Sequence, residues 1–108
     1  MKAAEWFLQQ GIHPALAPWF GHLYEVAASN GLRPQVTSTY RSPEKQAALY
    51  KRWLEGKNAY PVARPGTSYH EYGRAVDMVV TNAPQLGAYW RYLGGTWGGE
   101  KDPVHFHA

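Results

Sequence analysis

The feature that most restricts the fold is a short apolar run, Ala75-Val76-Asp77-Met78-Val79-Val80, which contains a single acid. A continuous apolar run of this length is typical of a central, buried β-strand. A carboxylate inside such a strand is costly to bury unless a partner compensates its charge. The fold must therefore bring a cation or several hydrogen-bond donors to Asp77.

Helix and strand patterns alternate along the rest of the chain. Ser42 can cap a helix whose first residue is Pro43, and Gly56 would end it. A proline beyond the first turn disrupts a helix, so Pro18 indicates a kink or a later start in the helix expected from about Pro14 to Asn30. The sequence further predicts helices in residues 1–10 and 83–93, strands in 35–40 and 104–107, and loops in 57–69 and 94–99.

Size and composition limit the chain to one small domain, residues 1–108, without a separate wall-binding or other module. The chain has no cysteine, which excludes disulfides and thiolate metal ligands, and its 44% apolar residues argue against disorder. We expect Trp19, Phe20 and Leu23, which recur at helical spacing, to lie in the core. A net charge of +3 is modest beside that of nucleic-acid binders, and no run is long enough to span a membrane.

A metal ion is one of the few partners that would make Asp77 favourable in a buried strand. His70 precedes it by seven residues and His105 lies near the C-terminus, and zinc prefers such nitrogen ligands. Two histidines and one aspartate leave the fourth tetrahedral position open, as in a catalytic zinc site, where bound water becomes acidic enough to attack a carbonyl. Asp102, three residues before His105, is the candidate general base, and Glu100 is a weaker one.

At these residues the sequence resembles the zinc peptidases that include VanY-type D-Ala-D-Ala carboxypeptidases and phage L-alanyl-D-glutamate endopeptidases. The family pattern Ser-x-His-x-x-Gly-x-Ala-x-Asp is matched from Ser68 to Asp77 without a gap. A strand ending in Tyr-Arg-Ser before a Gln-bearing helix is matched from Thr39 to Tyr50, and an acid three residues before His-Phe is matched by Asp102. The resemblance extends from about Leu16 to the C-terminus.

The resemblance implies a role for each matching residue. His70, Asp77 and His105 would bind Zn2+, and Asp102 would be the catalytic base. Three further residues would serve the substrate: Arg41 would bind a substrate carboxylate, Ser68 would hydrogen-bond substrate near the metal, and Gln46 would support the site from its helix. Gly73 would permit the tight turn between the first two ligands.

The sequence departs from the family pattern at one position near the third ligand. Endopeptidases of the family usually follow His-Phe with Glu, whereas His107 occupies that place here. Hydrogen-bond partners of the second ring nitrogen orient metal-bound imidazoles, so a histidine at position 107 changes which partner His105 can have. His107 could replace the usual partner, compete for the metal or face solvent, and we expect the last.

The resemblance implies an α+β fold of the hedgehog and D-Ala-D-Ala peptidase kind. A small, mostly antiparallel sheet would carry the zinc site on one face, with helices on the other face and at the N-terminus. The implied function is zinc-dependent hydrolysis of an amide bond in a bacterial peptidoglycan stem peptide. Because Asp102 rather than Glu precedes His105, we favour the bond between L-Ala and D-Glu. The runner-up is D-Ala-D-Ala carboxypeptidase activity, and a non-catalytic zinc-stabilised binding module is the alternative of another class.

Partners and location follow from the same comparison. We expect a monomer that binds the peptidoglycan stem peptide, does not bind nucleic acid and does not insert into a membrane. No signal peptide is visible, since Glu5 and the polar Gln9-Gln10 interrupt the apolar residues at the start. We therefore expect synthesis in the cytoplasm and action on the wall after release through a holin or lysis, as phage endolysins act.

Overall fold

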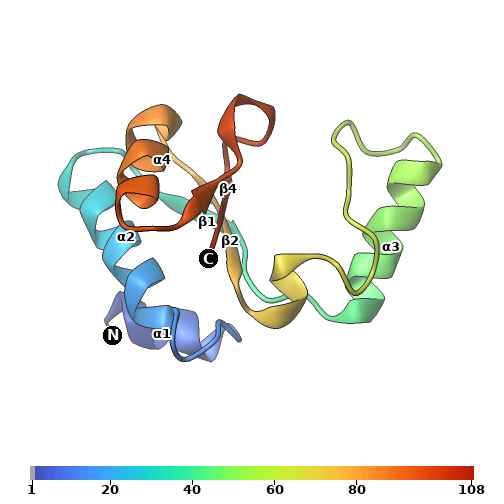
Figure 1. Cartoon of the computed structure of the whole chain (residues 1–108), viewed down its shortest axis with the longest axis horizontal. Helices are drawn as coiled ribbons and strands as arrows, with labels where there is room; N and C mark the ends of the chain where they lie inside the picture. Colours follow the sequence, from blue (N-terminus) through green and yellow to red (C-terminus); the bar gives the residue numbers. More distant parts are fainter. Residues whose placement is uncertain (1) are drawn as a thin grey trace.

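A four-stranded antiparallel sheet forms the centre of the molecule, for which a computed structural model describes residues 2–108 (Figure 1). The strands are β1 (Gln35–Ser38), β2 (Ala75–Val79), β3 (Thr96–Trp97) and β4 (His105–His107), in the order β1-β2-β4-β3. The last strand of the chain thus lies beside β2, with His105 directly opposite Asp77. Ser38 of β1 lies opposite Asp77 on its other side.

The helices lie on two sides of this sheet. Figure 1 shows α1 (Ala3–Gln9), α2 (Ala17–Ser29) and α4 (Ala83–Tyr92) grouped on one side, and α3 (Pro43–Leu54) standing apart on the other. We call α3 and the loop that follows it, residues 43–66, the arm. Two short 3-10 helices, η1 (Tyr69–Tyr72) and η2 (Gly99–Lys101), precede β2 and β4. No helix within residues 2–108 is both long and apolar enough to cross a membrane.

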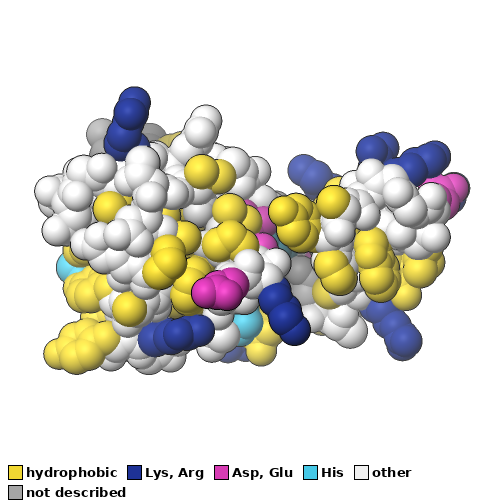
Figure 2. All heavy atoms as spheres, turned by 90° about the horizontal axis from the view of Figure 1, so that it is seen from above, with side chains coloured by type: hydrophobic (Ala, Val, Ile, Leu, Met, Phe, Trp, Pro, Cys, Tyr) yellow, Lys and Arg dark blue, Asp and Glu magenta, His cyan; other side chains and the backbone are white. Residues whose placement is uncertain are grey.

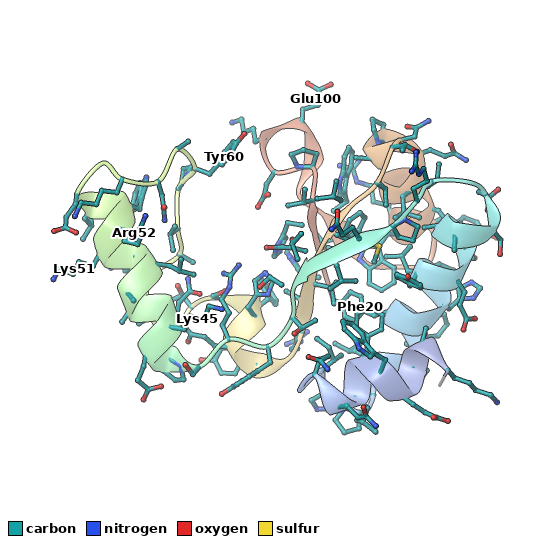
Figure 3. All side chains as sticks on the ribbon, turned by 180° about the vertical axis from the view of Figure 1, so that it is seen from behind. Phe20, Lys45, Lys51, Arg52, Tyr60 and Glu100 are labelled. Atoms are coloured by element: carbon teal, nitrogen blue, oxygen red, sulfur yellow. The ribbon has the colours of Figure 1, made fainter. Side chains whose placement is uncertain are left out.

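The alternation of side chains along β2 and β4 separates a core face from a polar face. Val76, Met78 and Phe106 are fully buried in the cluster that the helices cover. Phe20 of α2, labelled in Figure 3, stacks on Trp90 of α4 within this cluster, with ring centroids 5.0 Å apart. Side chains at the alternate positions, among them those of Asp77 and His105, are left on the face that looks toward the arm.

Most of the expected elements are confirmed. The α+β fold with its antiparallel sheet is present, and the side chain of Ser42 caps α3 by accepting a 3.2 Å hydrogen bond from the Lys45 amide. The second helix starts late, at Ala17, so that Pro18 falls in its first turn, where a missing amide donor does no harm.

Three expectations were wrong in detail. Trp19 is 51% exposed and does not belong to the core, unlike Phe20 and Leu23. Not all helices lie away from the polar face, because Gln46 and Leu49 of α3 line the same cleft as Asp77. The glycine-rich segment expected as a loop contains β3. The ring of its Trp97 packs so closely on Gly87 that a Cβ on this glycine would lie only 2.2 Å from it.

Candidate metal centre

The three residues expected to bind metal converge on the polar face of the sheet. His70 Nε2 lies 3.1 Å and His105 Nδ1 lies 3.2 Å from the same oxygen, Asp77 Oδ1. One ligand atom from each residue can be chosen so that all three atoms lie within 4.8 Å of one another. These residues come from η1, β2 and β4, so the cluster joins a short 3-10 helix to two neighbouring strands.

The turn between His70 and Asp77 depends on Gly73. After the single turn of η1, Gly73 adopts φ +67°, a left-handed conformation that glycine enters without strain. A Cβ at this position would lie 2.5 Å from the Gly11 carbonyl oxygen and 2.8 Å from the His13 nitrogen. The expected tight turn is therefore present, and the packing there excludes a side chain.

The outward nitrogen of His70 determines what its inward nitrogen can do. His70 is 2% exposed, and its Nδ1 donates a 2.7 Å hydrogen bond to the Thr39 carbonyl oxygen. In a neutral imidazole this leaves Nε2 with a lone pair that faces the carboxylate of Asp77. The Nε2 lone pair and the Asp77 oxygen repel each other at 3.1 Å unless a cation lies between them or Nε2 carries a proton. A cation with two nitrogen ligands and one oxygen ligand fits this donor set.

Asp77 is surrounded by positive or proton-bearing groups. Its Oδ2 accepts a 3.2 Å hydrogen bond from Arg41 Nη2, and both side chains are mostly buried, at 16% and 17% exposed. In the metal-free protein, burial would raise the pKa of Asp77, but its hydrogen bonds with His105 and His70 outweigh the burial and hold the pKa well below that of an ordinary aspartate. The carboxylate is therefore ionised and available as a ligand.

Arg41 is fixed by contacts on three of its nitrogens. Besides Asp77, it donates to Ser38 Oγ and to Gln46 Oε1, each at 3.2 Å. Gln46 is 1% exposed and donates in turn to the Ala63 carbonyl oxygen at 2.8 Å, so that its hydrogen bond with Arg41 links the site to both segments of the arm. Each Nη of Arg41 retains one N–H that could donate a hydrogen bond to a substrate carboxylate.

The other predicted site residues line the same cleft. Ser68 is buried, and its Oγ accepts a hydrogen bond from the His70 amide, which leaves its own proton free to donate. Asp102 is exposed at the end of η2, and the His105 amide donates to its carbonyl oxygen at 3.1 Å. Burial on one side, reinforced by the negative charge of Asp77, raises the pKa of Asp102. Glu100, the weaker candidate base, is not among the residues that line the cleft.

The cleft lies between the sheet and the arm and has a volume of about 660 Å³. Figure 2 shows a hollow between the body and the arm, with acidic and histidine atoms visible inside it. In Figure 3, Tyr60 on the loop of the arm lies across the open side from η2, while Glu100 points outward from η2 and away from the cleft. Along the arm the wall is largely apolar, with Leu49, Pro61 and Val62 among its residues.

His107 does not face solvent as expected. It is half-buried, and its Nδ1 lies 2.8 Å from His105 Nε2. Burial, followed by the positive charges of His105 and Arg74, lowers the pKa of His107 to about 4. The spacing of two residues in a strand was the signal that could have placed both imidazoles on one face. The Thr39 carbonyl was also missed, since a backbone atom leaves no mark in the sequence pattern.

The sequence is similar to known peptidases of the bacterial cell wall. Residues 9–96 match the VanY family, described as D-alanyl-D-alanine carboxypeptidase. The peptidoglycan L-alanyl-D-glutamate endopeptidase CwlK of Bacillus subtilis (strain 168) is 36% identical over 70 residues. This match covers 64% of the chain, and the chain spans 42% of the length of that relative.

Solved structures show the same fold. The crystal structure of a vancomycin-resistance D,D-pentapeptidase VanY in complex with Zn(II) has a TM-score of 0.68 at 23% identity, over 89% of this chain and 71% of that one. The L-Ala D-Glu endopeptidase ChiX of Serratia marcescens has a TM-score of 0.61 at 24% identity, over 97% and 85% of the two chains. Because the family match includes most of the residues that build the cleft, the chain belongs to the VanY family.

Proposed function

We propose that this chain is a zinc-dependent peptidase that hydrolyses an amide bond in the stem peptide of bacterial peptidoglycan. The observation that carries the proposal is the meeting of His70, Asp77 and His105 on the floor of a cleft that Asp102 also lines. Two imidazoles and a carboxylate leave a position for a reacting molecule, which distinguishes a catalytic zinc site from a closed structural one.

The residues around the metal position divide the chemistry among them. When bound, zinc supplies Lewis acidity that polarises a carbonyl and makes a water molecule acidic. Asp102 accepts the proton of the attacking water, a step that its raised pKa favours, and then returns a proton to the leaving amine. Arg41, held beside Asp77, uses its two remaining N–H groups to hold a carboxylate of the stem peptide. Ser68 donates its hydroxyl proton to the substrate next to the metal position.

The bond that we favour is the one between L-Ala and D-Glu. The relative CwlK bears the name of an endopeptidase with this specificity, as does the structural neighbour ChiX. The aspartate at position 102, rather than a glutamate, also resembles that branch. D-Ala-D-Ala carboxypeptidase activity is the second candidate, because the matched family carries that description and Arg41 offers a cation for a terminal carboxylate.

We also propose that the active unit is a monomer, since the three expected metal ligands, the candidate base Asp102 and Arg41 meet within one chain. The proposed substrate lies in the cell wall, so protein made in the cytoplasm must be released before it can act. No nucleic acid or membrane takes part in this proposal.

The test is the release of new amino groups from purified peptidoglycan by the zinc-loaded protein. Asp102→Asn should lower the rate by about 10²- to 10⁴-fold, the usual contribution of a general base, and leave the zinc content unchanged. His70→Ala should lose both zinc and activity. Glu100→Gln is the matched control and should retain the wild-type rate. Equal inactivity of wild type and Asp102→Asn on every wall tested, with zinc bound, would support the non-catalytic binding module instead.

A further inference from the structure

We infer that His107 is a positioning residue that fixes the proton and the ring orientation of the metal ligand His105. The inference deepens the proposed function and rests on its metal centre. It begins with β4, where side chains two residues apart lie on the same face of the sheet. His105 and His107 are such a pair, with ring centroids 5.0 Å apart, and both lie on the polar face.

The two nitrogens of His105 face different groups. Its Nδ1 lies 3.2 Å from Asp77 Oδ1, and its Nε2 lies 2.8 Å from His107 Nδ1. A metal held with Asp77 therefore binds His105 through Nδ1, and His107 sits behind the ring at Nε2. This arrangement makes His107 a partner of the ligand and not a competitor for the metal.

His107 is itself held in place by stacking. Its ring lies 3.8 Å from the ring of Tyr69 with an angle of only 7° between the planes, and the guanidinium of Arg74 lies 5.5 Å from the centre of the Tyr69 ring. The His107 carbonyl oxygen accepts a 3.0 Å hydrogen bond from Trp90 Nε1, which anchors the backbone. Because Tyr69 precedes the ligand His70 directly, the stack also links the segments that carry two of the three ligands.

The proton arrangement follows from the chemistry of imidazole. A neutral His105 that offers the Nδ1 lone pair to a metal must carry its proton on Nε2. That proton points to His107 Nδ1, which must accept it and therefore carries its own proton on Nε2. His70 is arranged in the same manner, with its outward Nδ1 donating to the Thr39 carbonyl oxygen. Each histidine ligand thus has one outward hydrogen bond that orients its inward lone pair.

Zinc affinity, measured by competition with a chromophoric chelator, tests the inference without depending on activity. His107→Phe keeps an aromatic ring for the stack on Tyr69 but removes the acceptor, and it should weaken zinc binding about 10- to 100-fold, as loss of an outer partner does. His107→Gln keeps an acceptor oxygen and should recover most of that loss. His22→Phe is the matched control, because His22 bonds Tyr89 and takes no part in the metal centre. It should bind zinc as the wild type does.

The cobalt-substituted protein and NMR supply readouts that a purely structural role would not move. His107→Phe should alter the visible spectrum of bound Co2+, and ¹⁵N shifts of the zinc-loaded wild type should show His105 protonated at Nε2 and His107 unprotonated at Nδ1. Wild-type zinc affinity in His107→Phe, or a proton on His107 Nδ1, would overturn the inference and leave the proposed function intact. A wild-type protein that binds no zinc would overturn both.

Discussion

Replacement of Gly73 by alanine tests the link between local backbone geometry and the metal centre. Gly73 lies in the turn between His70 and Asp77, at φ +67°, and its carbonyl oxygen accepts a 2.9 Å hydrogen bond from the His13 amide. The added methyl group would lie 2.5 Å from the Gly11 carbonyl oxygen. These neighbours are backbone atoms, so no side-chain rotation can relieve the contact.

Two costs follow from this geometry. A side chain in the left-handed region costs about 1 kcal/mol. Displacing residues 11–13 stretches the His13–Gly73 hydrogen bond and disturbs the packing beside it, at a further cost of about 2 kcal/mol. We therefore expect Gly73→Ala to lower the free energy of unfolding by about 3 kcal/mol and to weaken zinc binding, because the turn sets the separation of His70 from Asp77.

Urea unfolding of the metal-free protein measures the first effect, with Gly31→Ala as the matched control. Gly31 has nearly the same φ, +72°, but a Cβ there would meet no atom within 4 Å. That variant should lose only the conformational cost of about 1 kcal/mol. If Gly73→Ala lost no more stability than Gly31→Ala, the close approach at Gly73 would have no energetic effect and the reasoning would be refuted.

Three further predictions concern the metal, the pH and Arg41. Removal of zinc by a chelator should lower Tm, because the ion joins η1, β2 and β4; an unchanged Tm after complete removal would contradict this. In the metal-free protein, the pKa of His107 falls from about 6.5 when unfolded to about 4 when folded, so its contribution to stability is present above pH 6.5 and is lost as the pH falls toward 4. The urea midpoint should accordingly fall more steeply with falling pH for wild type than for His107→Gln. The same pH dependence of the midpoint in both proteins would contradict the lowered pKa of His107. Arg41→Met should lower the free energy of unfolding of the metal-free protein by about 2 kcal/mol, because the Asp77 carboxylate and the Gln46 amide lose their partner. Calorimetry can measure this loss. A loss under about 0.5 kcal/mol would show that water replaces the guanidinium.

The parts of the site that lie close together in sequence were the most predictable. The spacing from Ser68 to Asp77 places a ligand, a glycine turn and a second ligand in ten residues, and the turn forms as expected. His105 is distant from Asp77 in sequence, and it was placed there by the nitrogen ligands that zinc prefers and by the resemblance to the family. The Ser42 cap is likewise a local interaction, and it too is present.

The missed features depend on contacts between distant segments. β3 has only two residues in a glycine-rich stretch, and it is stabilised by the fit of Trp97 against Gly87, which no local pattern reveals. The exposure of Trp19 depends on how α1 and α4 cover α2, since its helical spacing alone suits the core. The side of the sheet on which the arm stands is also a property of the whole chain.

Mass spectrometry of peptidoglycan fragments after digestion tests the central claim most directly. The zinc-loaded wild type should release fragments with a new amino terminus at D-Glu, and neither the chelated protein nor Asp102→Asn should release them. Loss of terminal D-Ala instead would assign the carboxypeptidase specificity and correct the bond. Fragments identical with and without zinc, or identical for wild type and Asp102→Asn, would contradict the account of a zinc peptidase built on His70, Asp77 and His105.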